Sequence, residues 1–122
     1  MIKWGIRIAF VLATIFIVND VASLGDPIQF IDLTSFMIVV VPTLFAAAVG
    51  YLNSRAIAIR CAIYTVVVSS LLGVVIGVIQ TFGNAFGDTE AIFVGLSVAL
   101  LPLFYGLTIA LLLLPFHLSS DD

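Results

Sequence analysis

Residues 91–116 read AIFVGLSVALLPLFYGLTIALLLLPF, a run without a single charged side chain. Its length suits a helix that crosses a membrane, which needs about 20 mostly apolar residues. Pro102 interrupts the run near its middle and has no backbone N–H for the carbonyl four residues earlier. Lipid cannot bond that carbonyl, so protein or a water-filled cavity must cover it. The stretch therefore predicts a membrane helix with a kink that lies against protein or a water-filled cavity.

The composition of the whole chain agrees with a membrane protein. Of its 122 residues 63% are hydrophobic and 9% are charged, and the mean hydropathy is +1.35. Soluble folded chains average about a quarter charged residues. Three more apolar runs, at about 5–21, 33–52 and 57–82, precede the run at 91–116. We expect an all-α integral membrane protein, in which residues 1–122 form one domain of four transmembrane helices.

A cleaved secretory signal is the alternative interpretation of the N-terminus. Lys3 and Arg7 would then form its basic region. The apolar run after Arg7 is longer than the core of a signal peptide, and no clear cleavage site closes it. We therefore expect the first run to stay as a membrane helix.

Turn-forming and capping residues separate the four runs. Gly25-Asp26-Pro27 lies between the first and second, and Gly83-Asn84 and Gly87-Asp88 lie between the third and fourth. Asp32 and Asp88 each stand just before an apolar run, so they are predicted to cap the second and fourth helices.

The charged residues predict the orientation. In a four-pass topology the acidic residues of the two longer links fall on one side, and the four basic residues fall on the other: Lys3, Arg7, Arg55 and Arg60. By the positive-inside rule, both termini are expected in the cytoplasm. Such asymmetry argues against a small dual-topology exporter, as does the lack of a charge near the centre of any span.

Nothing in the sequence points to an enzyme, a cofactor or a metal. Cys61 is the one cysteine and His117 the one histidine, and no Cys/His cluster has metal-ligand spacing. An ion-coupled transporter would need an ionisable group deep in the membrane, which a partner would have to supply.

The third and fourth runs carry small residues at helical spacing, a pattern that lets membrane helices approach closely. Two interpretations stay open: the stripes serve packing alone, or they also line a central cavity beside the Pro102 kink. The stripes are Thr65, Ser69, Gly73, Gly77 and then Gln80 or Thr81 in the third run, and Gly95, Ala99, Pro102, Gly106 and Ala110 in the fourth.

Three stretches, at 28–49, 70–92 and 97–116, resemble flagellar-motor stator A-subunits of the MotA/TolQ/ExbB proton-channel family. In the first stretch Val41-Pro42 replaces a family glycine pair. The residues that match the family are Phe30, Asp32, Ser35, Ile38, Val39 and Thr43 in the first stretch, Gly73 and Gly77 in the second, and Val98-Ala99-Leu100-Leu101, Tyr105-Gly106 and Pro115 in the third.

The resemblance implies a bacterial inner-membrane protein that forms a ring, most simply a pentamer. Such a ring surrounds single-pass helices of a B-type subunit that carry a protonatable aspartate, and ion binding turns it. The third and fourth helices would line the inner wall. The residues then expected to face the ion path or the partner are Thr65, Ser69, Gly73, Val74, Gly77, Pro102, Leu103, Tyr105 and Gly106.

Two departures from the family pattern shape the functional prediction. The link between the second and third helices spans only about residues 53–56, so the large cytoplasmic rotor-binding domain of the stators is missing there. The family's path-facing threonines fall on Val74, Pro102 and Leu103, and a family proline falls on Val67. Protons are therefore expected rather than sodium, and a non-conducting membrane scaffold is the alternative function.

Overall fold

The computed structural model describes residues 2–22, 32–84 and 87–118, all the regular elements of which are helices. Four spans are long and apolar enough to cross a membrane, as the sequence predicted. The predicted turn at Gly25-Asp26-Pro27 lies outside the described residues. The helices are α1 (Ile2–Ala22), α2 (Leu33–Tyr51), α3 (Arg55–Asn84), α4 (Thr89–Ala99) and α5 (Leu101–Leu118).

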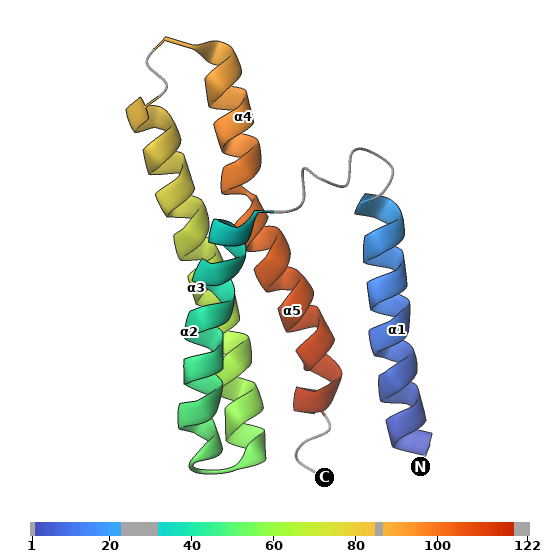
Figure 1. Cartoon of the computed structure of the whole chain (residues 1–122). Helices are drawn as coiled ribbons and strands as arrows, with labels where there is room; N and C mark the ends of the chain where they lie inside the picture. Colours follow the sequence, from blue (N-terminus) through green and yellow to red (C-terminus); the bar gives the residue numbers. More distant parts are fainter. Residues whose placement is uncertain (1, 23–31, 85–86, 119–122) are drawn as a thin grey trace.

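The fourth span is two helices rather than the one predicted at 91–116. The α4 helix ends at Ala99 and α5 begins at Leu101, with Leu100 between them. The cause is Pro102, because it lacks the N–H that would bond the Val98 carbonyl. Figure 1 shows α5 running at an angle to α4 below this break.

The turn between α3 and α4 is shorter than predicted. Gly83 and Asn84 belong to the last turn of α3, so the prediction of a turn at these two residues was wrong. Gly87 has a φ of +71°, a conformation that costs glycine little, and it immediately precedes the α4 cap. Asp88 caps α4 as predicted, since its carboxylate accepts the N–H of Ala91 at 3.1 Å.

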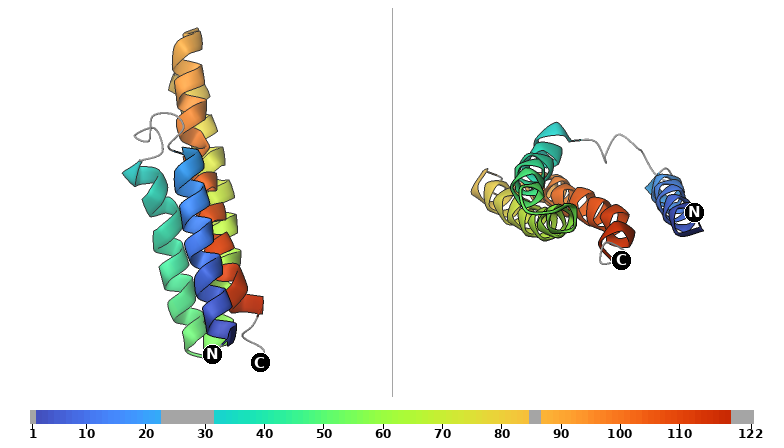
Figure 2. Two further views of the ribbon diagram at one scale, coloured as in Figure 1. Left: turned by 90° about the vertical axis from the view of Figure 1, so that its right-hand side faces the viewer. Right: turned by 90° about the horizontal axis from the view of Figure 1, so that it is seen from below.

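Helix α3 is the centre of the packing, with α2 on one side and the α4–α5 span on another (Figures 1 and 2). Among the described residues, helix α1 lies apart and makes its main contact with α5, where Trp4 meets Phe116 with ring centroids 6.3 Å apart. Thr14 is its one buried residue among those described. Most of its apolar surface is therefore left for lipid or another protein to cover.

Small residues set the distance between α3 and the α4–α5 span. A Cβ added to Gly77 would lie 2.7 Å from the Cβ of Ala99, and one added to Gly73 would lie 2.7 Å from the Cβ of Pro102. Gly106 and Gly95 likewise leave room for Ser70 and Thr81 on α3. These pairs form a ladder that we call the small-residue ladder: Ser70 with Gly106, Gly73 with Pro102, Gly77 with Ala99, and Thr81 with Gly95.

The ladder shows one use of the small stripes. Their close contacts are with the opposite helix of the same chain, which agrees with the packing interpretation. These glycines are already packed against a helix of their own chain, which leaves little of their surface for contact with another chain.

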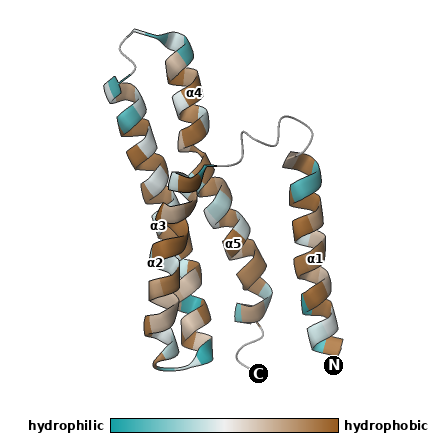
Figure 3. Ribbon diagram, viewed as in Figure 1, coloured by the Kyte–Doolittle hydropathy of each residue, from teal (hydrophilic) through white to brown (hydrophobic). Residues whose placement is uncertain are grey.

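The charged residues divide between the two ends of the molecule. The start of α1, with Lys3 and Arg7, and the start of α3, with Arg55 and Arg60, lie toward the same end (Figure 1). Hydropathy along the ribbon shows apolar helix bodies, with hydrophilic residues gathered toward the helix ends (Figure 3). This separation is the one that the positive-inside argument assumed.

The helices differ in length, which leaves α2 short of the α3–α4 turn. With 19 residues α2 is about 28 Å long, whereas the 30 residues of α3 extend about 45 Å. Figure 1 shows α2 beginning part-way along α3. Beyond that level α3 and α4 continue as a pair, and a crevice opens where α2 starts.

Candidate functional site

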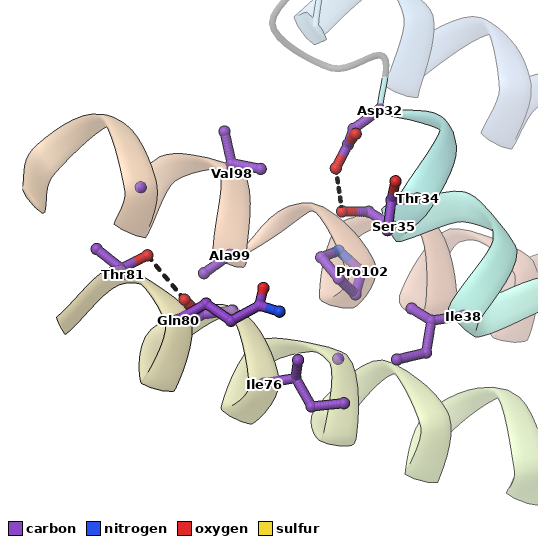
Figure 4. Close-up of a pocket in the computed structure, with 13 residues that line it drawn as sticks. Asp32, Thr34, Ser35, Ile38, Ile76, Gln80, Thr81, Val98, Ala99 and Pro102 are labelled. Atoms are coloured by element: carbon purple, nitrogen blue, oxygen red, sulfur yellow. Dashed lines mark hydrogen bonds between the residues drawn. The ribbon is translucent and has the colours of Figure 1, made fainter. Parts of the chain in front are cut away.

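The crevice has a volume of about 360 Å³ and lies where three helices meet: the start of α2, the second half of α3, and the α4–α5 break (Figure 4). Its wall combines a carboxylate, hydroxyls and an amide with apolar side chains. The lining residues are Asp32, Thr34, Ser35, Ile38, Gly73, Ile76, Gly77, Gln80, Thr81, Gly95, Val98, Ala99 and Pro102.

Asp32 supplies the carboxylate of the crevice. It occupies the N-cap position of α2 with extended backbone angles, but its side chain bonds no backbone N–H of the helix. Instead, its Oδ2 accepts the hydroxyl of Ser35, which is buried. The prediction of Asp32 at the cap position is confirmed, and the side-chain capping bond is absent. The half-buried carboxylate is thereby left to line the crevice (Figure 4).

Tyr105 ties the start of α2 to α5. Its hydroxyl oxygen accepts the backbone N–H of Asp32 at 2.9 Å, and its ring lies edge-on to Phe36 with centroids 5.8 Å apart. The family resemblance placed Tyr105 among the residues that face the ion path or the partner. The contact with the amide of Asp32 instead links the tyrosine to the crevice through its carboxylate residue.

The helix break forms the wall opposite Asp32. Pro102 is buried against Gly73, and the missing N–H at Pro102 leaves the Val98 carbonyl without its usual helical partner. Val98 and Pro102 both line the crevice (Figure 4). A polar backbone group at this depth needs water or protein to satisfy it, so a crevice with polar residues suits this position.

Gln80 and Thr81 extend the polar lining toward the α3–α4 turn. The Gln80 side chain is exposed and lies in the crevice (Figure 4). The Thr81 hydroxyl donates to the Gly77 carbonyl at 2.7 Å, which satisfies it within its own helix. Together with Asp32 and Ser35, these groups could hold a short file of water molecules.

The predicted path residues do not gather in one place. Gly73, Gly77 and Pro102 line the crevice, whereas Gly106 packs against Ser70. Thr65 and Ser69 line a second, apolar pocket of about 400 Å³ between α2 and α3, beside Ile38 and Pro42. The structure therefore spreads these residues along both faces of α3.

Val74 and Leu103, which stand at family threonine positions, are half-buried and do not line the crevice. Neither offers a polar side chain to an ion. Their assignment to an ion path stays a prediction.

Sequence reasoning missed the acid of the crevice. Asp32 was interpreted only as a helix cap, and Ser35 was given no role in a path. A signal was present, because Asp32 and Ser35 both match the family pattern in the first stretch. Their joint position opposite Pro102 depends on how α2 packs, which the local sequence does not express.

Comparison with known proteins assigns the chain to a protein family. The model of the MotA/TolQ/ExbB proton channel family matches residues 43–120, from α2 through the end of α5. No curated protein and no solved structure matches the chain. The match includes α3, α4 and α5, whereas the crevice residues at the start of α2 lie outside it. Because the match covers more than half of the sequence, the chain belongs to the MotA/TolQ/ExbB proton channel family.

Proposed function

We propose that the chain is a compact, non-enzymatic ring subunit of a membrane complex driven by the proton-motive force. Copies of it, five by family resemblance, surround single-pass partner helices that carry the ion-binding aspartate. The ring lies in a bacterial inner membrane with both termini in the cytoplasm. The observation that carries this proposal is the family match over α3, α4 and α5, the helices that would face the partner.

The crevice supports a role for the chain in delivering protons. Asp32 stands just before α2, which begins part-way along α3 and runs from there toward the end with the basic residues (Figure 1). By the positive-inside rule the start of α2 therefore faces the outer side. A carboxylate can take up and release protons, and water near Gln80 and the Val98 carbonyl could pass them inward. In this proposal the crevice is the outer entrance, and the aspartate of the partner completes the path.

The short link between α2 and α3 limits what the ring can drive. Only residues 52–54 separate the two helices, so this link provides no domain that could engage a rotor. We propose that force passes instead through the partner helices or through the exposed ends of the ring.

A reconstitution experiment tests the proposal. The chain, copurified with its single-pass partner, is placed in liposomes containing a pH-sensitive dye, and a potassium gradient with valinomycin drives protons inward. We expect acidification that is lost when the membrane aspartate of the partner is changed to asparagine. Native mass spectrometry of the same sample should show five copies of the chain, and a sample containing only monomers would contradict the ring.

A non-conducting scaffold is the second candidate. It is favoured by the apolar residues at family threonine positions, Val74 and Leu103, and by Pro102, whose ring is packed against Gly73. The same liposome assay separates the two functions: a scaffold assembles with the partner but gives no acidification with any variant.

A further inference from the structure

Tyr105 is attached to the first turn of α2 at two points. Its hydroxyl accepts the N–H of Asp32 at 2.9 Å, although the two residues are 73 positions apart in sequence. Its ring contacts Phe36, whose own N–H bonds the Asp32 carbonyl at 3.0 Å. Both contacts therefore hold the same helical turn.

Other hydroxyls of the membrane helices act differently. Thr43, Ser69 and Thr108 each donate to the carbonyl four residues earlier in their own helix, at 2.7 Å. Bonds of that kind satisfy the side chain but do not position one helix against another. The Tyr105 hydroxyl, by contrast, joins α5 to α2.

We infer that Tyr105 is a positioning residue that holds the Asp32 carboxylate at the crevice, opposite Pro102. The carboxylate makes no capping bond to a backbone N–H of α2, and the N–H of Asp32 itself is held by α5 through the Tyr105 hydroxyl. This inference rests on the proposed function, in which Asp32 receives protons.

The helix break sets where the tyrosine lies. Tyr105 is in the first turns of α5, just past Leu100 and Pro102. The angle between α4 and α5 thus determines the position of its hydroxyl. A change in that angle would move the start of α2 and the carboxylate with it, so the break and the acid are mechanically coupled.

The first test measures amide hydrogen exchange at Asp32 by NMR in lipid nanodiscs. Tyr105→Phe keeps the ring and its contact with Phe36 but removes the hydroxyl acceptor. We expect exchange at Asp32 to accelerate about tenfold, the order expected for one lost hydrogen bond. Tyr51→Phe is the matched control, because Tyr51 is 69% exposed at the opposite end of α2. Equal exchange at Asp32 in wild type and Tyr105→Phe would overturn the inference.

The second test is a double-mutant cycle on proton flux in the liposome assay. If Tyr105 acts through Asp32, Tyr105→Phe lowers flux in the wild-type background and has no further effect in Asp32→Asn. Losses that multiply in the double variant would show independent roles and would reject positioning. If the wild-type complex conducts no protons, the proposed function fails, and the exchange measurement still decides whether Tyr105 holds Asp32.

Discussion

At the scale of single residues, the close approach of α3 to α4 and α5 depends on missing or small side chains. Gly73 is the clearest case, because its hydrogen faces the ring of Pro102. A proline ring cannot rotate away as a flexible side chain would, so the contact tolerates little added volume. Ser70 makes the neighbouring contact with Gly106 and is 0% exposed.

Gly73→Ala should therefore destabilise the chain. An added methyl would lie 2.7 Å from Pro102, and overpacking of this kind costs about 1–3 kcal/mol. Gly83→Ala is the control in the same helix, since nothing lies within 4 Å of a Cβ there. Unfolding free energies in detergent micelles, measured for both variants, provide the check. Equal stability of the two variants would contradict the packing described here.

At the scale of elements, the break between α4 and α5 shapes the crevice. The sequence predicted a kink at Pro102, and the structure goes further by ending one helix and starting another. Two other prolines, Pro42 and Pro115, lie inside helices that continue past them. The difference lies in the setting: Pro102 is buried against α3, whereas Pro42 is exposed.

Pro102→Ala should rejoin α4 and α5, because alanine restores the N–H that bonds the Val98 carbonyl. Spin labels at Phe93 and Leu111, both exposed, report the angle in a Cys61→Ser background. We expect the backbone separation to lengthen toward the roughly 27 Å that a straight helix gives over this interval. Pro115→Ala, beyond both labels, should leave the distance unchanged. An unaltered distance in Pro102→Ala would show that packing on α3, rather than the proline, imposes the break.

At the scale of the whole molecule, the positions of the basic residues and of the crevice agree with one orientation in the membrane. All four Lys and Arg residues lie near one end, whereas the crevice is lined by the start of α2, the second half of α3 and the α4–α5 break, which lie away from that end (Figure 1). Helix α1 adds one span but little packing, and its exposed apolar surface suits a position facing lipid or a neighbouring subunit.

Membrane orientation can be measured by cysteine labelling in the Cys61→Ser background. Ser54→Cys lies in the link between α2 and α3, next to the basic residues, and Thr89→Cys lies at the start of α4. With a membrane-impermeant maleimide, the cysteine at position 89 should react from the outer side of the membrane. The cysteine at position 54 should react only after permeabilisation. The reverse pattern would show the inverted topology, in which the crevice could not be an entrance for protons from the outer side.

The sequence by itself determined the number of membrane spans, the end that carries the bases and the site of the helix break. These features follow from hydropathy, charge and the missing proline N–H, each of which acts within one segment of chain. Only the tertiary structure decided that Tyr105 bonds the amide of Asp32 and that the small stripes pair within one subunit. Those contacts join residues distant in sequence, and their geometry depends on where α2 begins along α3 and on the angle between α4 and α5. No local pattern encodes either quantity, because both result from how the helices pack together.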